Sequence, residues 1–360
     1  MNRPHSDEAN PLFGPSPGKL NRWQVRSPRD AAFFLAKKAR NAAKASGNPH
    51  VLTVGRATTF NRWIREDLER RGFTAGRMTL AELAAGDSPP GSGCAIVVCT
   101  ETDIRRTTEA ARAVMRHPEL LGLPFEAVTL TAGDYEVLER YDRVRASGLV
   151  SPVPILEPAF AEIYEASMAL FEPKCDVRDY LDLCQAVSQV IDNGIEGDVA
   201  EFGSFQGHSG WLLARLMDRR SSDRRLFLFD MFDAFPTENL GIDRFWSGSH
   251  PVDFGRVRER FRPFPFVTLV RGDFTHTFDR SGLQRLCLVH VDCDSYRGTS
   301  YLVQRLFPEI LSRGGIMVFE DYGHPQLIGS RAAVHDYFDG RTDAVRFFSH
   351  FSGCYLVVKR

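Results

Sequence analysis

The chain has 360 residues, 43% hydrophobic and 25% charged, a composition typical of a globular protein long enough for two domains. Its formal net charge of -1 excludes the strong positive field that would attract nucleic acid or an anionic membrane. No stretch approaches the roughly 20 apolar residues of a spanning helix, and the start lacks the apolar core of a signal peptide. The seven cysteines show no CxxC pairing and are expected to be reduced thiols. We therefore expect a cytoplasmic protein with no nucleic-acid or membrane partner.

The N-terminal part predicts an arm followed by a small α/β domain. Residues 1–26 are rich in Pro, Asn and Ser and are expected to form a flexible arm. A helix is predicted from Pro28, with Ser27 as its N-cap and Gly47 after its end. Apolar runs then alternate with helical segments, which is typical of parallel βαβ units. Because the first turn has one glycine and no dinucleotide motif, we assign the domain at residues 27–150 to packing, oligomerisation or substrate coverage.

A Pro-rich junction marks the predicted boundary between the two domains. Pro152, Pro154 and Pro158 interrupt regular structure, and residues 151–174 are expected to form a linker and a helix. From 175 to 360 apolar strands again alternate with helices, and the last two apolar runs predict an antiparallel hairpin at the sheet edge. The sequence therefore predicts an α/β protein with a C-terminal doubly wound, Rossmann-like sheet, mostly parallel with an antiparallel last strand.

The first strand of the C-terminal part leads into a turn suited to a ligand. It ends in Glu201, and Gly203, Gly207 and Gly210 let the backbone of the turn approach a ligand at a helix amino end. Asp230 ends the next strand, 23 positions after Gly207, where an acid typically accepts hydrogen bonds from ribose hydroxyls. The alternative is that Asp230 caps the following turn. We predict a cofactor with a ribose at this turn.

The third strand ends in Gly272 and Asp273, which have two interpretations. The short Asp273 side chain is suited to contact the edge of an adenine ring. An Asx turn explains the same residue almost as well.

Two pairs of acids follow the next two strands. Asp292 and Asp294 come after the fourth strand, and Glu320 and Asp321 come after the fifth. If these strands are parallel neighbours, about 4.8 Å apart, their carboxylates converge at one edge of the sheet. Because burying acids is costly without a cation, and because oxygen ligands suit hard cations, the pattern predicts a Mg²⁺ site.

Several of these segments resemble the class I S-adenosylmethionine-dependent methyltransferases. Within that class they resemble the macrocin O-methyltransferase family, which methylates sugar hydroxyls on macrolides and related natural products. The resemblance covers roughly residues 175 to 360 and is carried by VAEFGSFQGHSG, LFLFDMFDAFP, VRGDF, VDCDSYRGT and FEDYGHP. Against the family pattern D-x-D-x-Y-x-S-T, this chain has Gly298 in place of Ser.

The resemblance implies roles for the acids and for nearby histidines. The metal ligands fall on Asp292, Glu320 and Asp321, with Glu320 where many members have Asp. Asp294 matches the general base. His324, in the loop after the acid pair, is the reserve base, whereas His290 lies inside a strand and is expected to be a packed core residue.

The resemblance also implies S-adenosyl-L-methionine as cofactor, with its ribose on Asp230, its amino acid end near Glu201 and its adenine near Asp273. The full set of implied contacts is Glu201, Gly203, Ser204, Gly207, Ser209, Asp230, Gly272 and Asp273.

The sequence thus predicts a metal-dependent O-methyltransferase acting on a small-molecule glycoside or saccharide, in a homo-oligomer. One alternative is a glycosyltransferase that uses Asp292-Cys293-Asp294 as a DxD motif. Another is a binding protein that kept the nucleotide fold and lost catalysis.

Overall fold

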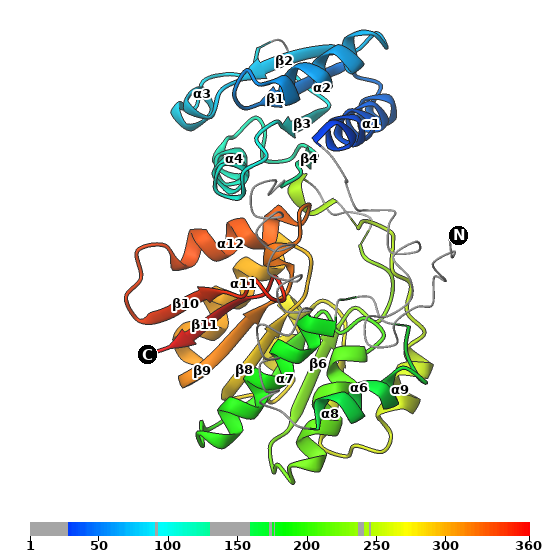
Figure 1. The fold of residues 1–360 in the computed structure, drawn as a ribbon, viewed down its shortest axis with the longest axis vertical. Coiled ribbons are helices and arrows are strands. Elements are labelled where there is room, and N and C mark those ends of the chain that lie inside the picture. The colour runs from blue at the N-terminus through cyan, green and yellow to red at the C-terminus, as the bar shows by residue number, and fades with distance from the viewer. Residues whose placement is uncertain are drawn as a thin grey trace, which may run out of the picture.

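The computed structural model of the chain contains two α/β units, each built on its own sheet (Figure 1). It describes residues 28–90, 93–129, 159–172, 175, 177–236, 241–244 and 246–360. The predicted N-terminal arm, Ser27 and the Pro-rich junction with the boundary near residue 150 lie outside these residues. Among the described helices, none has the length and apolar character needed to cross a membrane. All seven cysteines are free thiols.

The smaller unit has a four-stranded parallel sheet in the order β2-β1-β3-β4. Its strands are β1 (His50–Val54), β2 (Thr74–Met78), β3 (Ile96–Cys99) and β4 (Phe125–Glu126). Its helices are α1 (Pro28–Ser46), α2 (Thr59–Glu69), α3 (Leu80–Ala85) and α4 (Ile104–Arg116). The predicted parallel arrangement is confirmed, but β2 and α3 were missed. The reason is that TAGRM has no apolar alternation and that a six-residue helix is too short to show a period.

The larger unit has seven strands in the order β10-β11-β9-β8-β5-β6-β7. They are β5 (Asp198–Phe202), β6 (Leu226–Asp230), β7 (Val267–Arg271), β8 (Leu286–Val291), β9 (Leu311–Phe319), β10 (Ala344–Phe348) and β11 (Tyr355–Lys359). The pairings of β11 with β9 and with β10 are antiparallel, and the others are parallel. The mostly parallel sheet with an antiparallel last strand is therefore confirmed. The predicted hairpin forms, although β11 lies inside the sheet and β10 forms its edge.

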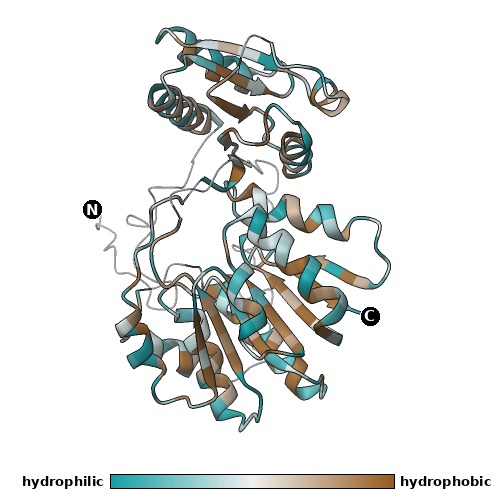
Figure 2. Cartoon of the chain, turned by 180° about the vertical axis from the view of Figure 1, so that it is seen from behind, coloured by the Kyte–Doolittle hydropathy of each residue, from teal (hydrophilic) through white to brown (hydrophobic). Residues whose placement is uncertain are grey.

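Helices cover both faces of the large sheet. The helices of this unit are α6 (Phe160–Ser167), α7 (Val177–Asp192), α8 (His208–Arg219), α9 (Phe254–Phe261), α10 (Phe274–Thr277), α11 (Tyr296–Glu309) and α12 (Ile328–Phe338), with short 3-10 turns η3 (Gly241–Arg244), η4 (Phe278–Arg280) and η5 (Asp321–Gly323). Helices α6 to α9 pack on one face, and α11 and α12 pack on the other. Figure 2 shows the strands between them as largely hydrophobic, because both faces of the sheet are buried.

The register of the sheet brings three strand ends together. Phe202 at the end of β5 pairs with Val291 at the end of β8, and Val291 pairs with Phe319 at the end of β9. The residues that follow these strands therefore emerge at one edge of the sheet, where open α/β folds bind ligands.

The two units contact each other through α4 and α12, which lie side by side (Figure 1). Leu120 and Phe125 of the smaller unit share a buried cluster with Ile328 and Ala332 of α12. The contact between the units is thus partly apolar core.

Candidate active site

Three acids converge where β8 and β9 end. The ligand atoms of Asp292, Glu320 and Asp321 all lie within 4.8 Å of one another. The register places Asp292 and Glu320 directly after the paired residues Val291 and Phe319. The predicted convergence of these carboxylates is therefore confirmed, and its cause is the parallel pairing of the two strands.

The charges in this acid group oppose one another. Burial raises the pKa of Asp292 well above its usual range, and the charge of Glu320 raises it further. Burial, followed by the charge of Asp321, raises the pKa of Glu320 to about 8. Three ionised carboxylates this close repel strongly in a low-dielectric site, so the group suits a bound cation.

One oxygen of this group has a free lone pair. Asp321 is 1% exposed, and its Oδ2 accepts hydrogen bonds from the backbone N–H of Asp294 at 2.8 Å and from the Ser330 hydroxyl at 3.1 Å. Its Oδ1 is buried and has no hydrogen-bond partner among the described residues. A buried oxygen without a donor is costly and is what a metal ion would satisfy. The residues present therefore fit Mg²⁺.

Asp294 lies beside the acid group in an unusual backbone conformation. Its φ is +56°, in the left-handed region that non-glycine residues seldom adopt. The indole N–H of Trp246 donates to its Oδ1 at 3.0 Å. Burial raises the pKa of Asp294 well above its usual range, and the charge of Asp321 adds to this. A strained residue held by two separate contacts is typical of a functional site.

Gly298, the departure from the family pattern, has a structural cause. The Ser295 hydroxyl caps α11 by accepting from the Gly298 N–H at 3.0 Å. A Cβ at position 298 would lie 2.6 Å from that same hydroxyl oxygen and 2.9 Å from the Cys293 sulfur. The Ser295 cap and a side chain at position 298 are therefore mutually exclusive.

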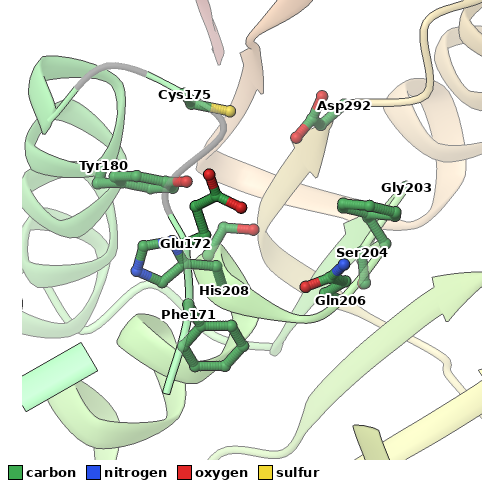
Figure 3. Close-up of a pocket in the computed structure, with 11 residues that line it drawn as sticks. Phe171, Glu172, Cys175, Tyr180, Gly203, Ser204, Gln206, His208 and Asp292 are labelled. Atoms are coloured by element: carbon green, nitrogen blue, oxygen red, sulfur yellow. The ribbon is translucent and has the colours of Figure 1, made fainter. Parts of the chain in front are cut away.

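A pocket opens next to the acid group, on the turn between β5 and α8. Among the predicted residues, Gly203, Ser204, Ser209 and Asp292 line it. Figure 3 shows Asp292 on one side of this pocket, with Tyr180 and His208 on the other. Gly203 has a φ of +101°, and a Cβ there would lie 1.7 Å from the Asp292 carbonyl oxygen. Only glycine lets the turn pass this close to the end of β8.

Glu201 is a buried residue of β5, two positions before the pocket residue Gly203. It is 0% exposed, and its Oε2 is 3.0 Å from Nδ1 of His290, which is itself 3% exposed. The expectation that His290 is a packed core residue is confirmed. Oε1 of Glu201 has no hydrogen-bond partner among the described residues, so one buried acceptor remains available.

His208 is a pocket residue that the sequence did not single out as a site. Its ring stacks on Phe171 with centroids 4.7 Å apart, and its Nε2 is 2.8 Å from the Ser167 hydroxyl. That hydroxyl also donates to the Tyr164 carbonyl at 2.7 Å, so Nε2 carries the ring proton and Nδ1 is a bare acceptor. Burial lowers the pKa of His208 to about 4. Nδ1 is buried without a partner among the described residues.

Asp230 has the turn-capping contacts that were given as the alternative interpretation of its position, and its role as a ribose ligand stays a prediction. It accepts backbone hydrogen bonds from Phe205 at 2.9 Å and from Phe232 at 2.5 Å. It thus caps the turn that follows and also holds the turn after β5. Burial raises its pKa to about 6. A carboxylate has about four acceptor positions, so these two bonds leave capacity for a ribose.

The predicted adenine residues lie at the end of β7. The Gly272 N–H donates to the Asp230 carbonyl at 2.9 Å, which joins the ends of β6 and β7. Asp273 caps α10, with its Oδ1 accepting from the Thr275 N–H at 2.8 Å. This is the Asx-type geometry given above as the alternative.

The predicted Gly207, in the turn after β5, is the N-cap of α8, with a φ of +86°.

His324 is held by the turn that follows the acids. Its Nδ1 accepts from the backbone N–H groups of Gln326 and Leu327, both at 3.2 Å. Burial lowers its pKa to about 4. The ring is neutral near pH 7, and one of its two nitrogens is committed to the backbone.

Trp246 is the other residue that sequence reasoning missed. It follows η3, in a segment without an apolar period or a recognisable motif, and reaches Asp294 only through the folded chain. Asp243 of η3 accepts from the backbone N–H groups of Tyr296 at 2.6 Å and Arg297 at 3.0 Å. No signal in the sequence pairs these positions.

Known proteins are similar in sequence to the larger unit of this chain. Residues 178–343 match the macrocin-O-methyltransferase (TylF) family. A relative from Streptomyces olivaceus, the 8-demethyl-8-(2,3-dimethoxy-alpha-L-rhamnosyl)-tetracenomycin-C 4'-O-methyltransferase, is 29% identical over 172 residues, covering 44% of this chain and 64% of its own. The mycinamicin III 3''-O-methyltransferase of Micromonospora griseorubida is 25% identical over 221 residues, covering 55% and 82%. This chain therefore spans less than two thirds of the first relative.

Among solved structures, the O-methyltransferase NovP is 22% identical with a TM-score of 0.44, covering 51% of this chain and 80% of its own. The calicheamicin methyltransferase CalS11 is 21% identical with a TM-score of 0.44, covering 65% and 95%. The sequence match agrees with the motifs after β5, β6, β8 and β9, and residues 178–343 are similar to the macrocin-O-methyltransferase family.

Proposed function

We propose that this chain is an S-adenosyl-L-methionine-dependent, divalent-metal-dependent O-methyltransferase that acts on a sugar hydroxyl of a glycosylated natural product or related saccharide. The observation that carries the proposal is the acid group Asp292, Glu320 and Asp321, which adjoins both Asp294 and the pocket after β5. The family match and the names of the relatives, which are O-methyltransferases acting on glycosylated compounds, support the reaction and the acceptor class.

Asp292, Glu320 and Asp321 would hold the metal through their carboxylate oxygens. A bound divalent cation would lower the pKa of a sugar hydroxyl and orient it for attack. Glu320 in place of the family's Asp keeps a carboxylate oxygen as ligand. One oxygen of its longer side chain lies within 4.8 Å of a carboxylate oxygen of each of the other two acids.

Asp294 is the general base in this proposal. It would accept the proton of the acceptor hydroxyl, so that the hydroxyl oxygen becomes nucleophilic enough to take the methyl group that the cofactor would supply. The Trp246 N–H fixes the orientation of the carboxylate. His324 remains the reserve base, although its Nδ1 accepts from two backbone N–H groups.

The pocket residues bind the cofactor, which supplies an electrophilic methyl group. Oε1 of Glu201 and Nδ1 of His208 are buried acceptors without partners among the described residues, and they suit the cofactor's ammonium group. Asp230 binds the ribose with its remaining acceptor capacity. Gly203, Ser204, Gly207 and Ser209 form the turn around the amino acid end, with Gly272 and Asp273 near the adenine.

Calorimetry and a transfer assay test this function together. We expect heat on adding S-adenosylhomocysteine, no heat with nucleotide sugars, and methyl transfer to a panel of rhamnosides that stops with EDTA and returns with Mg²⁺. Binding of nucleotide sugars without S-adenosylhomocysteine binding would instead favour the glycosyltransferase. Cofactor binding with no response to Mg²⁺ would favour the non-catalytic protein. Homo-oligomerisation and a cytoplasmic location stay predictions, testable by mass photometry and by fractionation.

A further inference from the structure

Arg331 of α12 is completely buried between the two units. It is 0% exposed, and its guanidinium donates to threonine hydroxyls of the smaller unit. These bonds run from Nε to Thr108 at 2.8 Å, and from Nη2 to Thr107 at 3.2 Å and Thr129 at 2.9 Å. The smaller unit therefore supplies a cradle of three hydroxyls for one cation.

The hydrogen-bond partners of Arg331 among the described residues are all neutral oxygens. Its Nη1 donates to the Tyr322 carbonyl at 3.2 Å, and no ion pair to it occurs among the described residues. Burial lowers its pKa to about 10, which leaves it protonated near neutral pH. A buried charge without a directly paired acid is costly, although the charge of Asp103 favours the protonated form of Arg331; a purely apolar contact between α4 and α12 would avoid that cost. The arrangement indicates a requirement for directed hydrogen bonds at this place.

Those hydrogen bonds lead to the acid group. Tyr322, whose carbonyl Arg331 binds, directly follows Asp321. Ser330, which directly precedes Arg331, donates to Asp321 Oδ2 at 3.1 Å. The first turn of α12 therefore holds Asp321 from two sides, by its carboxylate and by the backbone of the next residue.

Further contacts fix α12 and the loop before it to the smaller unit. Arg112 and Arg116 of α4 both donate to Asp336 Oδ1 at 2.6 Å, and Tyr296 donates to Asp336 Oδ2 at 2.9 Å. The Thr129 N–H donates to the Pro325 carbonyl at 3.0 Å. The smaller unit thus contacts α12 near both ends and also the loop between η5 and α12.

We propose that the smaller unit positions the metal site, holding Arg331 in its threonine cradle so that Arg331 and Ser330 keep Asp321 in the geometry that binds the cation. The inference rests on the proposed metal dependence. Arg331 is a positioning residue, since it reaches the metal ligand through Tyr322 and α12.

The substitution Thr108→Val tests this directly, because it removes the acceptor of Arg331 Nε while keeping the side-chain shape. We expect the full chain carrying it to bind Mg²⁺ about tenfold more weakly, the lower end of losses seen when outer contacts to metal ligands are removed. Calorimetric titration with Mg²⁺, repeated with Mn²⁺ by electron paramagnetic resonance, gives the dissociation constant without an activity assay. Affinity for S-adenosylhomocysteine should change by less than about twofold.

Two matched variants separate this effect from general damage. Thr108→Ser keeps the hydroxyl and should restore wild-type Mg²⁺ affinity. Thr59→Val makes the same exchange at an exposed position of α2 and should leave Mg²⁺ affinity unchanged. If Thr108→Val does not fold, Thr129→Val removes a different acceptor of Arg331 and should give the same weakening.

A double-mutant cycle tests whether Thr108 and Ser330 both act on Asp321 through α12. Ser330→Ala should weaken Mg²⁺ binding, and its combination with Thr108→Val should weaken it by less than the product of the two single effects, because both act on the same turn of α12. A lower melting temperature with unchanged Mg²⁺ affinity in Thr108→Val would overturn the inference while leaving the proposed function intact. If the wild-type chain binds no divalent cation, the metal dependence fails first, and the inference fails with it.

Discussion

The indole N–H of Trp246 donates to the Asp294 carboxylate at 3.0 Å, across 48 positions of sequence. Trp246 follows η3, which is itself bound to the start of α11 through Asp243. The segment after β8 is therefore held at the Asp294 side chain by Trp246. It is also held at the backbone of Tyr296 and Arg297 by Asp243. This relationship makes Trp246 the residue that orients the proposed base, and its hydrogen bond favours the ionised form of Asp294 against the burial and the charge of Asp321.

Replacing Trp246 with Phe should lower kcat/KM about tenfold near neutral pH, since a hydrogen bond to a charged group contributes about 1.5 to 3 kcal/mol. The bond stabilises the ionised form of Asp294, so its loss raises the Asp294 pKa further. Because the base acts when ionised, the acidic limb of the pH profile of kcat/KM should move to higher pH. Trp63→Phe, in the smaller unit, is the control. A uniform loss at all pH values would argue against this role.

Asp294→Asn should reduce kcat by about a thousandfold, within the range for removing a general base. S-adenosylhomocysteine affinity should stay within about threefold, because Asp294 does not line the pocket. His324→Asn, which keeps an acceptor near the Nδ1 position for the turn, should retain most turnover. Single-turnover kinetics with both variants compares the two candidate bases. The opposite pattern, with His324→Asn inactive and Asp294→Asn active, would make His324 the base.

His208→Phe should weaken S-adenosylhomocysteine binding about tenfold or more, the loss expected for one hydrogen bond to a charged group. The phenyl ring keeps the stack on Phe171 but removes the Nδ1 acceptor. Affinity for 5′-methylthioadenosine, which lacks the amino acid end, should be unaffected. His276→Phe, at an exposed position, is the control. Equal losses for both ligands would show that the substitution damaged the pocket as a whole.

The metal-free protein should lose stability as the pH rises from about 4.5 to about 8, the ordinary and the raised pKa of Glu320. In this window the folded state binds more protons than the unfolded state, so the unfolding free energy falls with rising pH. Glu320→Gln should flatten this slope, as measured by urea unfolding with EDTA. Mg²⁺ at 100 times its dissociation constant should stabilise the wild type by about 2.7 kcal/mol. Equal slopes for wild type and Glu320→Gln would contradict the assignment of the slope to this group.

Much of the fold was readable from the sequence because strands buried on both faces appear as continuous apolar runs. LCLVHV and GGIMVF each end directly before acids, so parallel pairing alone was enough to predict the convergence of Asp292, Glu320 and Asp321. The turn after β5 was also predictable from spacing, because its glycines follow the strand that contains Glu201 and precede Asp230 by about 20 positions.

The remaining site residues depend on contacts between distant parts of the chain. Nδ1 of His208 is a bare acceptor because the proton of the ring lies on Nε2, which donates to the hydroxyl of Ser167, 41 positions earlier. Arg331 meets threonines more than 200 positions away, and neither partner stands in a periodic pattern. Local propensity and spacing carry no information about such pairs.

The position of β11 between β9 and β10 has a consequence for synthesis of the protein. Until Tyr355–Lys359 has left the ribosome, β9 has an unpaired edge directly before Glu320 and Asp321. An unpaired strand edge is prone to pair with other chains. A nascent chain that already carries all of the proposed metal ligands therefore still has an unpaired strand edge beside them, open to pairing with another chain.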